Sequence, residues 1–144
     1  MGNADAGFSG DTKFRKLQEN FGESRWNMKP FPEPHELLGL FEVEPTITDR
    51  DVPWCYNRLT YETVRGDDAI SCSIEPGYGQ LCLIWMRKSE LVARLELDDI
   101  ASLQVESSRG VEKLIAKFGN TAILDFELQL RPTIHVRWGN HRRP

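Results

Sequence analysis

The sequence contains few cysteines and histidines, and this scarcity excludes several kinds of site. Three cysteines occur in 144 residues without a C-x-x-C pair, so neither a disulfide framework nor a cysteine zinc site is predicted. The three histidines lack the spacing of a zinc-binding helix. We therefore predict no metal and no cofactor, and we interpret the cysteines as core residues in a reducing compartment. Cys72 and Cys82 flank one predicted turn and are expected to face each other across it.

Long apolar runs and a recognisable leader are also missing. No stretch approaches the roughly 18 uninterrupted apolar residues that a membrane-spanning helix requires. The first residues lack the basic start and apolar core of a secretory signal. We therefore expect a cytoplasmic protein without a membrane partner.

No motif of a known catalytic class is present. The patterns G-x-S-x-G and S-x-x-K do not occur, so serine hydrolase chemistry has no support. Gly77 and Gly79 are followed by the strand-like residues 81–86, whereas a phosphate-binding glycine loop requires a helix after it. We therefore assign both glycines to turn conformations with positive φ, and we predict a protein that is not an enzyme and has no catalytic residues.

Two short helices are predicted near the N-terminus. Residues 1–10 are small and polar, and we expect them to be a disordered lead-in to a single globular domain of residues 11–144. Apolar side chains recur with helical spacing over residues 11–22. A second helix is expected to begin at Pro34 and to be stopped by Pro45.

After these helices the apolar residues alternate with polar ones, which is the period of a β-strand. The alternation is clearest over residues 121–130, and turn sequences such as residues 65–68 separate the apolar runs. Residues 98–101 also fit a helical turn. The predicted fold is α+β and mainly β, an antiparallel sheet or sandwich of seven to eight strands with two short N-terminal helices.

The acidic residues are unevenly distributed in a chain whose net charge is −4. Residues 33–51 contain six acidic side chains and only Arg50 as a basic one. About a dozen residues from position 42 show no clear element, and long loops in compact domains are more often functional than idle. An acidic loop attracts and orients a basic partner. The predicted partner-binding residues are Glu33, Glu36, Glu42, Glu44, Asp49, Asp51, Trp54 and Tyr78.

The aromatic residues allow two interpretations. Trp85 and Trp138 fall in predicted strands and are expected in the core. Trp26 and Trp54 flank the proline-rich acidic segment, where they either anchor it to the sheet or belong to a contact surface. Tyr78 lies at the tip of a turn, which makes it a contact candidate.

These features favour a non-catalytic intracellular protein-binding domain. Its most concrete form is a bacterial immunity or inhibitor protein that neutralises a basic toxin through an acidic surface. One alternative is a β domain that holds a small molecule or lipid between sheet and helices. Another is nucleic-acid binding by the basic C-terminal segment, although the negative net charge argues against it. That segment contains His135, Arg137, Trp138, His141, Arg142 and Arg143.

Overall fold

The computed structural model describes residues 28–53 and 56–139 of the chain. Within them it has one α-helix, α2 (Pro34–Phe41), a 3-10 helix (Pro76–Tyr78) and nine strands. The strands are β1 (Thr46–Ile47), β2 (Leu59–Arg65), β3 (Asp68–Glu75), β4 (Gln80–Arg87), β5 (Glu90–Leu97), β6 (Ile100–Ser108), β7 (Val111–Phe118), β8 (Phe126–Arg131) and β9 (His135–Arg137).

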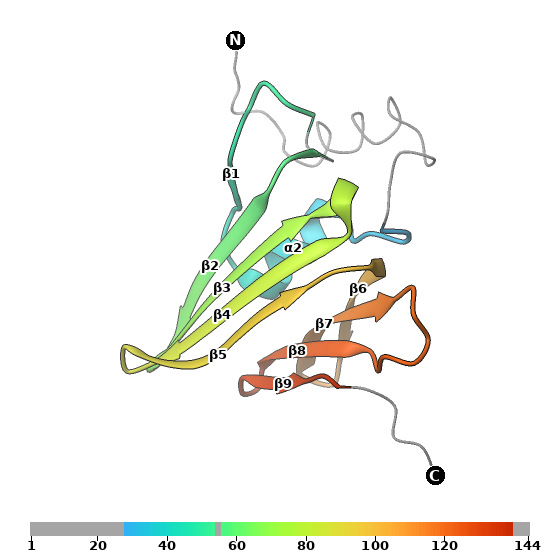
Figure 1. Cartoon of the computed structure of the whole chain (residues 1–144). Coiled ribbons are helices and arrows are strands. Elements are labelled where there is room, and N and C mark those ends of the chain that lie inside the picture. The colour runs from blue at the N-terminus through green and yellow to red at the C-terminus, as the bar shows by residue number, and fades with distance from the viewer. Residues whose placement is uncertain (1–27, 54–55, 140–144) are drawn as a thin grey trace.

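The strands form two antiparallel sheets. The first has the order β1-β2-β3-β4-β5 and the second the order β6-β7-β8-β9. Each strand pairs with its neighbour in the sequence, so both sheets are meanders. Figure 1 shows that the chain passes from one sheet to the other at the β5–β6 turn and that α2 lies behind the first sheet.

Two backbone hydrogen bonds hold the β5–β6 turn. The N–H of Ile100 donates to the carbonyl of Gly79 at 3.0 Å, and the N–H of Gly119 donates to the carbonyl of Asp99 at 2.9 Å. Asp99 has a φ of 61°, a left-handed conformation that Asp adopts more readily than most residues. The helical turn expected at residues 98–101 is wrong, because the residues between Leu97 and Ile100 join two strands directly.

Helix α2 begins as the sequence predicts. Pro34 lies in its first turn, where the missing N–H of proline costs no intrahelical hydrogen bond. The N–H of Glu33 donates to the carboxylate of Glu36 at 2.9 Å, which is one half of a capping box. The helix ends at Phe41 rather than at Pro45, because the next residue, Glu42, has a φ of 63° and donates its N–H to the carbonyl of Leu38 at 2.7 Å.

One face of α2 joins the two sheets. Leu37, Leu40 and Phe41 are buried, whereas Leu38 is 39% exposed. The Phe41 ring stacks on the ring of Tyr61 in β2, with centroids 4.7 Å apart and planes inclined by 18°. The helix also contacts β6 and β7. It therefore bridges a strand of the first sheet and two strands of the second.

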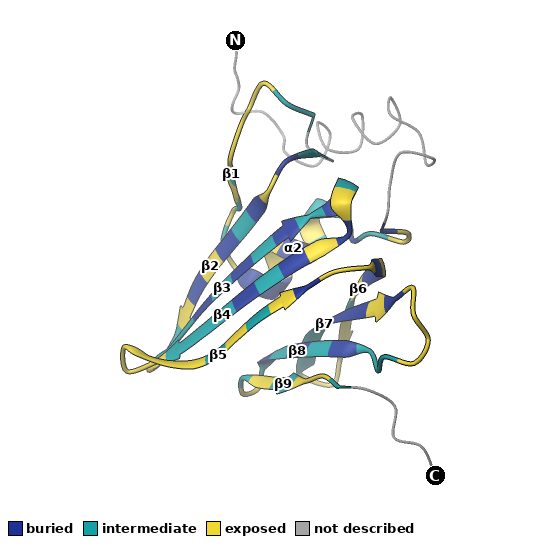
Figure 2. Cartoon of the chain, viewed as in Figure 1, coloured by how far each residue is buried: buried dark blue, intermediate teal, exposed yellow. Residues whose placement is uncertain are grey.

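The inner faces of both sheets contribute to one hydrophobic core. Figure 2 shows buried residues alternating with more exposed ones along β2, β3 and β4, as expected for strands with one covered face. The inward residues of the first sheet include Leu59, Tyr61, Ile70, Cys72, Ile74, Leu81, Leu83 and Leu97, and those of the second include Leu103, Leu114, Ala116, Phe126, Leu128 and Leu130.

The structure confirms a mainly β, antiparallel fold but corrects its details. The described residues contain nine strands rather than seven or eight. The additional strand is β1, which has only two residues, too few for a period to show in the sequence. The helix predicted over residues 11–22 and the lead-in of residues 1–10 lie outside the described residues.

The strand predicted over residues 121–130 begins only at Phe126. Before it, the N–H of Ala122 donates to the side-chain oxygen of Asn120 at 2.9 Å. The N–H of Leu124 donates to the carbonyl of Gly139 at 2.8 Å. These hydrogen bonds hold residues 120–125 as a loop, although their apolar pattern matches that of the strand.

Two predictions about the β3–β4 connection have different outcomes. Gly79 has a φ of 65°, as predicted, whereas Gly77 lies inside the 3-10 helix without a positive φ. The facing arrangement of the cysteines is wrong, because Cys82 pairs with Ser73, so Cys72 and Cys82 lie on opposite faces of the sheet. Burial raises the pKa of the inward Cys72 thiol, in agreement with its interpretation as an unreactive core residue.

Replacing Phe41 should test how strongly α2 is held between the sheets. We expect Phe41→Ala to lower the free energy of unfolding by about 3–5 kcal/mol, because it removes a buried ring and leaves a cavity. Leu38→Ala on the exposed side of the same helix should change it by less than about 0.5 kcal/mol. Urea unfolding followed by circular dichroism measures both values, and similar effects of the two substitutions would contradict the packing.

Candidate partner-binding surface

The first two predicted binding residues lie at the start of α2. Glu33 and Glu36 are both half-buried, and the Glu36 carboxylate accepts the Glu33 N–H described above. An acidic group in the first turn also interacts favourably with the helix dipole. Stabilisation of the helix is therefore a sufficient explanation for an acidic residue at position 36, and no contact with a binding partner is needed to explain it.

Glu42 belongs to an ion-pair network that ties the end of α2 to both sheets. Its carboxylate lies 2.6 Å from Nη1 of Arg131 in β8 and 3.6 Å from Nη1 of Arg65 in β2. Nη2 of Arg131 donates to the carbonyl of Gly39 at 2.7 Å and also to the carboxylate of Glu112. Glu42 thus has basic partners within the chain.

The loop between β1 and β2 is organised by Asn57, which is 3% exposed. Its side-chain oxygen accepts the N–H of Asp49 at 2.9 Å, and its amide donates to the carbonyls of Asp49 and Val52. The Asp49 carboxylate accepts the N–H of Asp51 at 3.0 Å, a local turn that is typical of Asp. The carboxylates of Asp49 and Asp51 are nevertheless exposed, as is Glu44.

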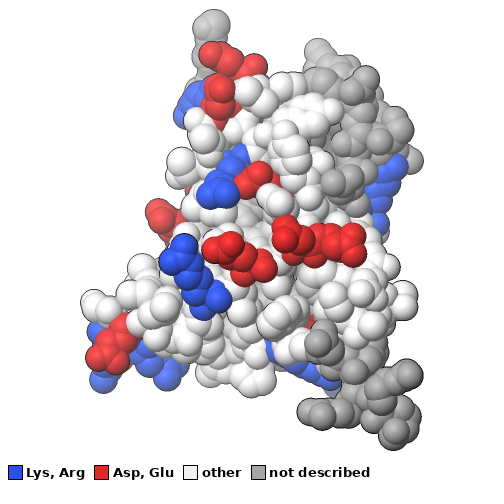
Figure 3. Space-filling view, in the orientation of Figure 1, with Lys and Arg blue, Asp and Glu red and all other residues white. Residues whose placement is uncertain are grey.

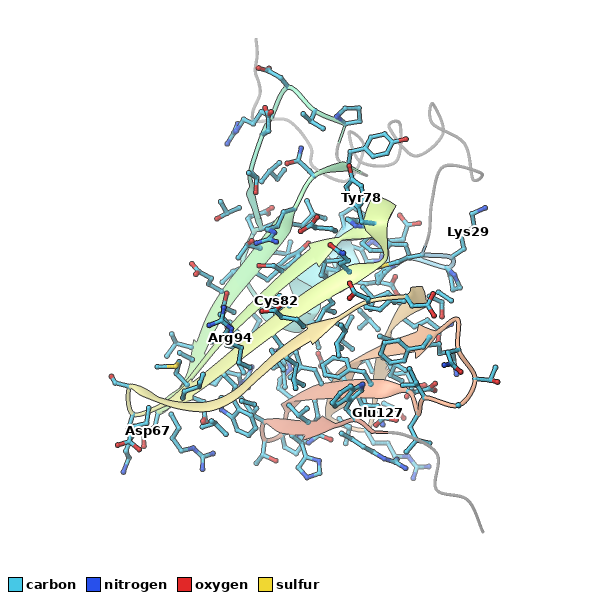
Figure 4. All side chains as sticks on the ribbon, in the orientation of Figure 1. Lys29, Asp67, Tyr78, Cys82, Arg94 and Glu127 are labelled. Carbon is cyan, nitrogen blue, oxygen red and sulfur yellow. The ribbon has the colours of Figure 1, made fainter. Side chains whose placement is uncertain are left out.

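Tyr78 lies near this loop, at the same end of the first sheet. The residue is 54% exposed, and the centroid of its ring lies 6.3 Å from that of Tyr56. Figure 4 shows Tyr78 above the β3–β4 connection and pointing away from the sheet. Trp54, the remaining predicted contact residue, lies outside the described residues, as does Trp26.

Figure 3 shows acidic side chains at several places on the face formed by β2–β5, including one group at the loop after β1 and another beside the β5–β6 turn. The first group corresponds to the acidic segment that the sequence indicates. Glu62 in β2 is also exposed and lies two residues beyond Thr60, the partner of Thr46 in β1. Glu62 is not among the residues predicted from the sequence, because the two-residue strand β1 and its pairing with β2 leave no pattern there.

A cleft of about 510 Å³ opens at the other end of the first sheet. The β2–β3 hairpin and the β8–β9 turn form its walls, with charged groups beside apolar ones. Its lining residues are Glu42, Val64, Arg65, Gly66, Asp68, Arg87, Leu130, Pro132, Thr133 and Ile134. This cleft is not the apolar space between sheet and helices that a lipid-binding domain was expected to show.

Asp68 is the most strongly engaged acidic residue of the cleft. Its carboxylate accepts hydrogen bonds from Nε of Arg87 at 2.9 Å and from Nε1 of Trp85 at 2.9 Å. The bond from Arg87, and after it the bond from Trp85, lowers the pKa of Asp68 below its ordinary value of 3.8. The Arg87 guanidinium also lies over the Trp85 ring, 5.8 Å from its centroid.

The basic C-terminal segment is mixed in charge where the structure describes it. Arg137 pairs in register with Glu127, and His135 with Gln129. Trp138 is 47% exposed rather than in the core, so this prediction is wrong, whereas Trp85 is half-buried against the core. His141, Arg142 and Arg143 lie outside the described residues.

The described residues contain neither a cluster of metal ligands nor a membrane-spanning helix. No group of three or more His, Cys, Asp or Glu side chains in that part of the chain could hold a metal ion. No helix among residues 28–53 and 56–139 is long and apolar enough to span a membrane.

Comparison with known proteins gives one informative likeness. No family model matches the chain, and no curated protein matches its sequence. A solved structure, the contact-dependent growth inhibition toxin–immunity protein complex from Klebsiella pneumoniae 342, contains a similar chain. The TM-score is 0.69, the match covers 81% of this chain and 99% of that chain, and the sequence identity is 17%. The two chains therefore share a fold.

The hydrogen bonds of Asp68 predict a dependence of stability on pH. Because the pKa of Asp68 is lowered in the folded protein, its contribution is complete above about pH 5, where an unfolded Asp is almost fully ionised, and is lost as the pH falls through the folded pKa. We expect Asp68→Asn to lower the melting temperature at pH 7 and to have a much smaller effect near pH 3. Asp67→Asn in the same turn is the control, and a pH-independent effect of Asp68→Asn would contradict this assignment.

Arg131 should matter more than a surface arginine. Arg131→Met removes hydrogen bonds to Glu112 and Gly39 from a side chain that is 18% exposed, so we expect a loss of about 2–3 kcal/mol in unfolding free energy. Arg58 pairs with Glu75 at the surface and is 52% exposed, so Arg58→Met should cost less than about 1 kcal/mol. Urea unfolding of both variants measures the two losses. Equal losses for Arg131→Met and Arg58→Met would contradict the prediction.

Proposed function

We propose that this protein is the immunity component of a toxin–immunity pair and that it binds its toxin directly. The likeness to a chain of the Klebsiella toxin–immunity complex carries the proposal, with a TM-score of 0.69. The match covers 99% of that chain, which favours a shared domain over a shared hairpin motif. The same function class is favoured by the negative net charge and by the exposed acidic segment.

The proposed toxin-binding surface is the acidic segment along the β1 edge of the first sheet. Glu44, Asp49 and Asp51 present exposed carboxylates there, and the buried Asn57 fixes the backbone that carries two of them. A fixed backbone lowers the entropy that binding costs. Carboxylates of one sign accelerate encounter with a basic protein and orient it. Tyr78, an exposed aromatic side chain, is a suitable apolar contact at the same end of the sheet.

Neutralisation is proposed to require binding alone, without a reaction on the toxin, and to take place in the cytoplasm. When this chain covers the basic surface of the toxin, the toxin would no longer reach an anionic target. Glu42 is proposed to contribute less than its neighbours, because Arg131 and Arg65 already engage its carboxylate.

A capture and growth experiment tests the proposed function. The purified chain is immobilised and incubated with lysate of its source cells, and each captured protein is then expressed alone and together with this chain. We expect one captured protein to arrest growth alone and to be harmless when the two are produced together. Growth arrest by this chain alone would instead identify it as a toxin, and the absence of any toxic partner would overturn the proposal.

A charge reversal tests the proposed surface. In Glu44→Lys/Asp51→Lys we expect the affinity for the captured partner to fall on the order of tenfold at low salt, chiefly through slower association. The control is Asp67→Lys/Glu106→Lys, which makes the same change in net charge at exposed positions elsewhere. Surface plasmon resonance measures both rates, and an equal loss in the two variants would exclude a specific acidic surface.

A further inference from the structure

The outer edge of β5 has no strand beside it among the described residues. β5 (Glu90–Leu97) is the last strand of the first sheet and pairs only with β4. Such an edge presents backbone N–H and C=O groups that can pair with another chain. The edge of β6 differs, because it exchanges hydrogen bonds with the backbone of Lys29 and Pro30. The other two edge strands, β1 and β9, have only two and three residues.

A bulge limits the part of β5 that can pair regularly. Trp85 pairs with Ala93 and Met86 with Leu91, so Val92 is an extra residue without a partner in β4. A bulge interrupts the ladder at that point and twists the strand. Regular alternation therefore continues only over residues 93–97.

Over these five residues the side chains follow a symmetric pattern. Ala93 and Leu95 are half-buried and Leu97 is buried, on the inner face. Arg94 and Glu96 point to the outer face, with 62% and 73% of their side chains exposed. Figure 4 shows Arg94 on the side of the sheet opposite to α2. The pattern is apolar, basic, apolar, acidic, apolar, with Leu95 at its centre.

Arg94 and Glu96 also form an ion pair within the strand. Nε of Arg94 lies 3.8 Å from the Glu96 carboxylate, which is near the upper limit for such a pair. Exposed ion pairs contribute little to stability. Both side chains can therefore exchange this contact for one across a strand interface at little cost.

We propose that a second copy of this chain pairs with β5 through the same five residues, antiparallel and about a two-fold axis at Leu95. In this register Arg94 lies opposite Glu96 of the second copy, and Glu96 opposite Arg94 of the second copy. Opposite charges directly across antiparallel strands stabilise the pair. On the inner face, Leu95 contacts Leu95 of the second copy, so the apolar inner faces of the two copies become continuous.

The neighbouring registers are unfavourable. If the two-fold axis lies at Arg94 or at Glu96, that residue lies opposite the same residue of the second copy. Like charges opposite each other are destabilising. An axis between two residues would place an outer side chain opposite an inner one, which the alternation of a covered sheet does not permit. The charges therefore select a single register, which joins the two five-stranded sheets into one.

The interface is small, so a concentration-dependent dimer is expected. Five residues per strand give an area below that of standard protein interfaces, and we expect dissociation constants on the order of micromolar. Sedimentation velocity of the wild type from about 1 to 200 μM should show a rise from monomer to dimer. A chain that stays monomeric over this range would overturn the proposal.

Charge exchange at the two positions tests the register. R94E places two acidic side chains opposite each other, and E96R places two basic ones opposite each other, so each single variant is expected to remain monomeric at about 200 μM. The double variant R94E/E96R restores opposite charges and should dimerise like the wild type. Because it contains both substitutions, its recovery excludes a folding defect as the cause of the losses. Dimerisation of both single variants would overturn the register.

A mixture provides a second test. Equal amounts of R94E and E96R, each monomeric alone, should form a heterodimer, because the two acidic side chains of the first variant then face the two basic side chains of the second. A mixture that stays monomeric would contradict the register.

Self-pairing through β5 does not depend on the proposed function, since the charge reversal that tests the toxin-binding surface changes Glu44 and Asp51 and leaves β5 unchanged. If the wild type is monomeric and R94E instead weakens binding of the captured partner, the edge pairs with that partner and the self-pairing proposal is overturned.

Discussion

The turn between β5 and β6 is the constraint on which the rest of the structure depends. Strands that are apolar on one face cannot continue as one flat meander, because that face would stay in water. At Asp99 the backbone adopts a left-handed conformation, and the chain enters a second sheet whose inner face meets that of the first. Hydrogen bonds from Ile100 to Gly79 and from Gly119 to Asp99 connect this turn to the β3–β4 connection and to the end of β7.

Once the sheets meet at that turn, the remaining opening between them must be filled. Helix α2 does so by stacking Phe41 on Tyr61 and by contacting β6 and β7. Its last turn is then fastened by Arg131, whose guanidinium contacts Gly39, Glu42 and Glu112. The cleft beside Glu42 follows from the same arrangement, because the tip of the β2–β3 hairpin and the β8–β9 turn approach each other there.

The sequence predicts those features that depend on neighbours in the chain. The burial of Leu37, Leu40 and Phe41 follows from helical spacing, and the inward positions of β2 and β3 follow from alternation. Residues 121–125 show where this reasoning fails, because their alternation is real but Asn120 accepts the hydrogen bonds of Ala122 and Ile123 in a turn.

The partners of the acidic residues are a second feature that local patterns do not reveal. Glu42 and Glu44 look equivalent in the sequence and both are exposed, yet Glu42 forms an ion pair with Arg131, 89 positions away. Only tertiary structure separates acids that stabilise the fold from acids available to a partner. The same limit applies to Asp68, which reads as a turn residue but binds Arg87 and Trp85.

The order of the first sheet makes the two proposed interfaces compatible. β1 and β5 are its opposite edges, so the acidic segment beside β1 and the free edge of β5 are separated by three strands. In a two-fold dimer paired through β5, each β1 edge becomes an outer edge of the joined sheet. A toxin bound along the acidic segment would therefore not contact the dimer interface, and one dimer could hold two toxin molecules on opposite sides.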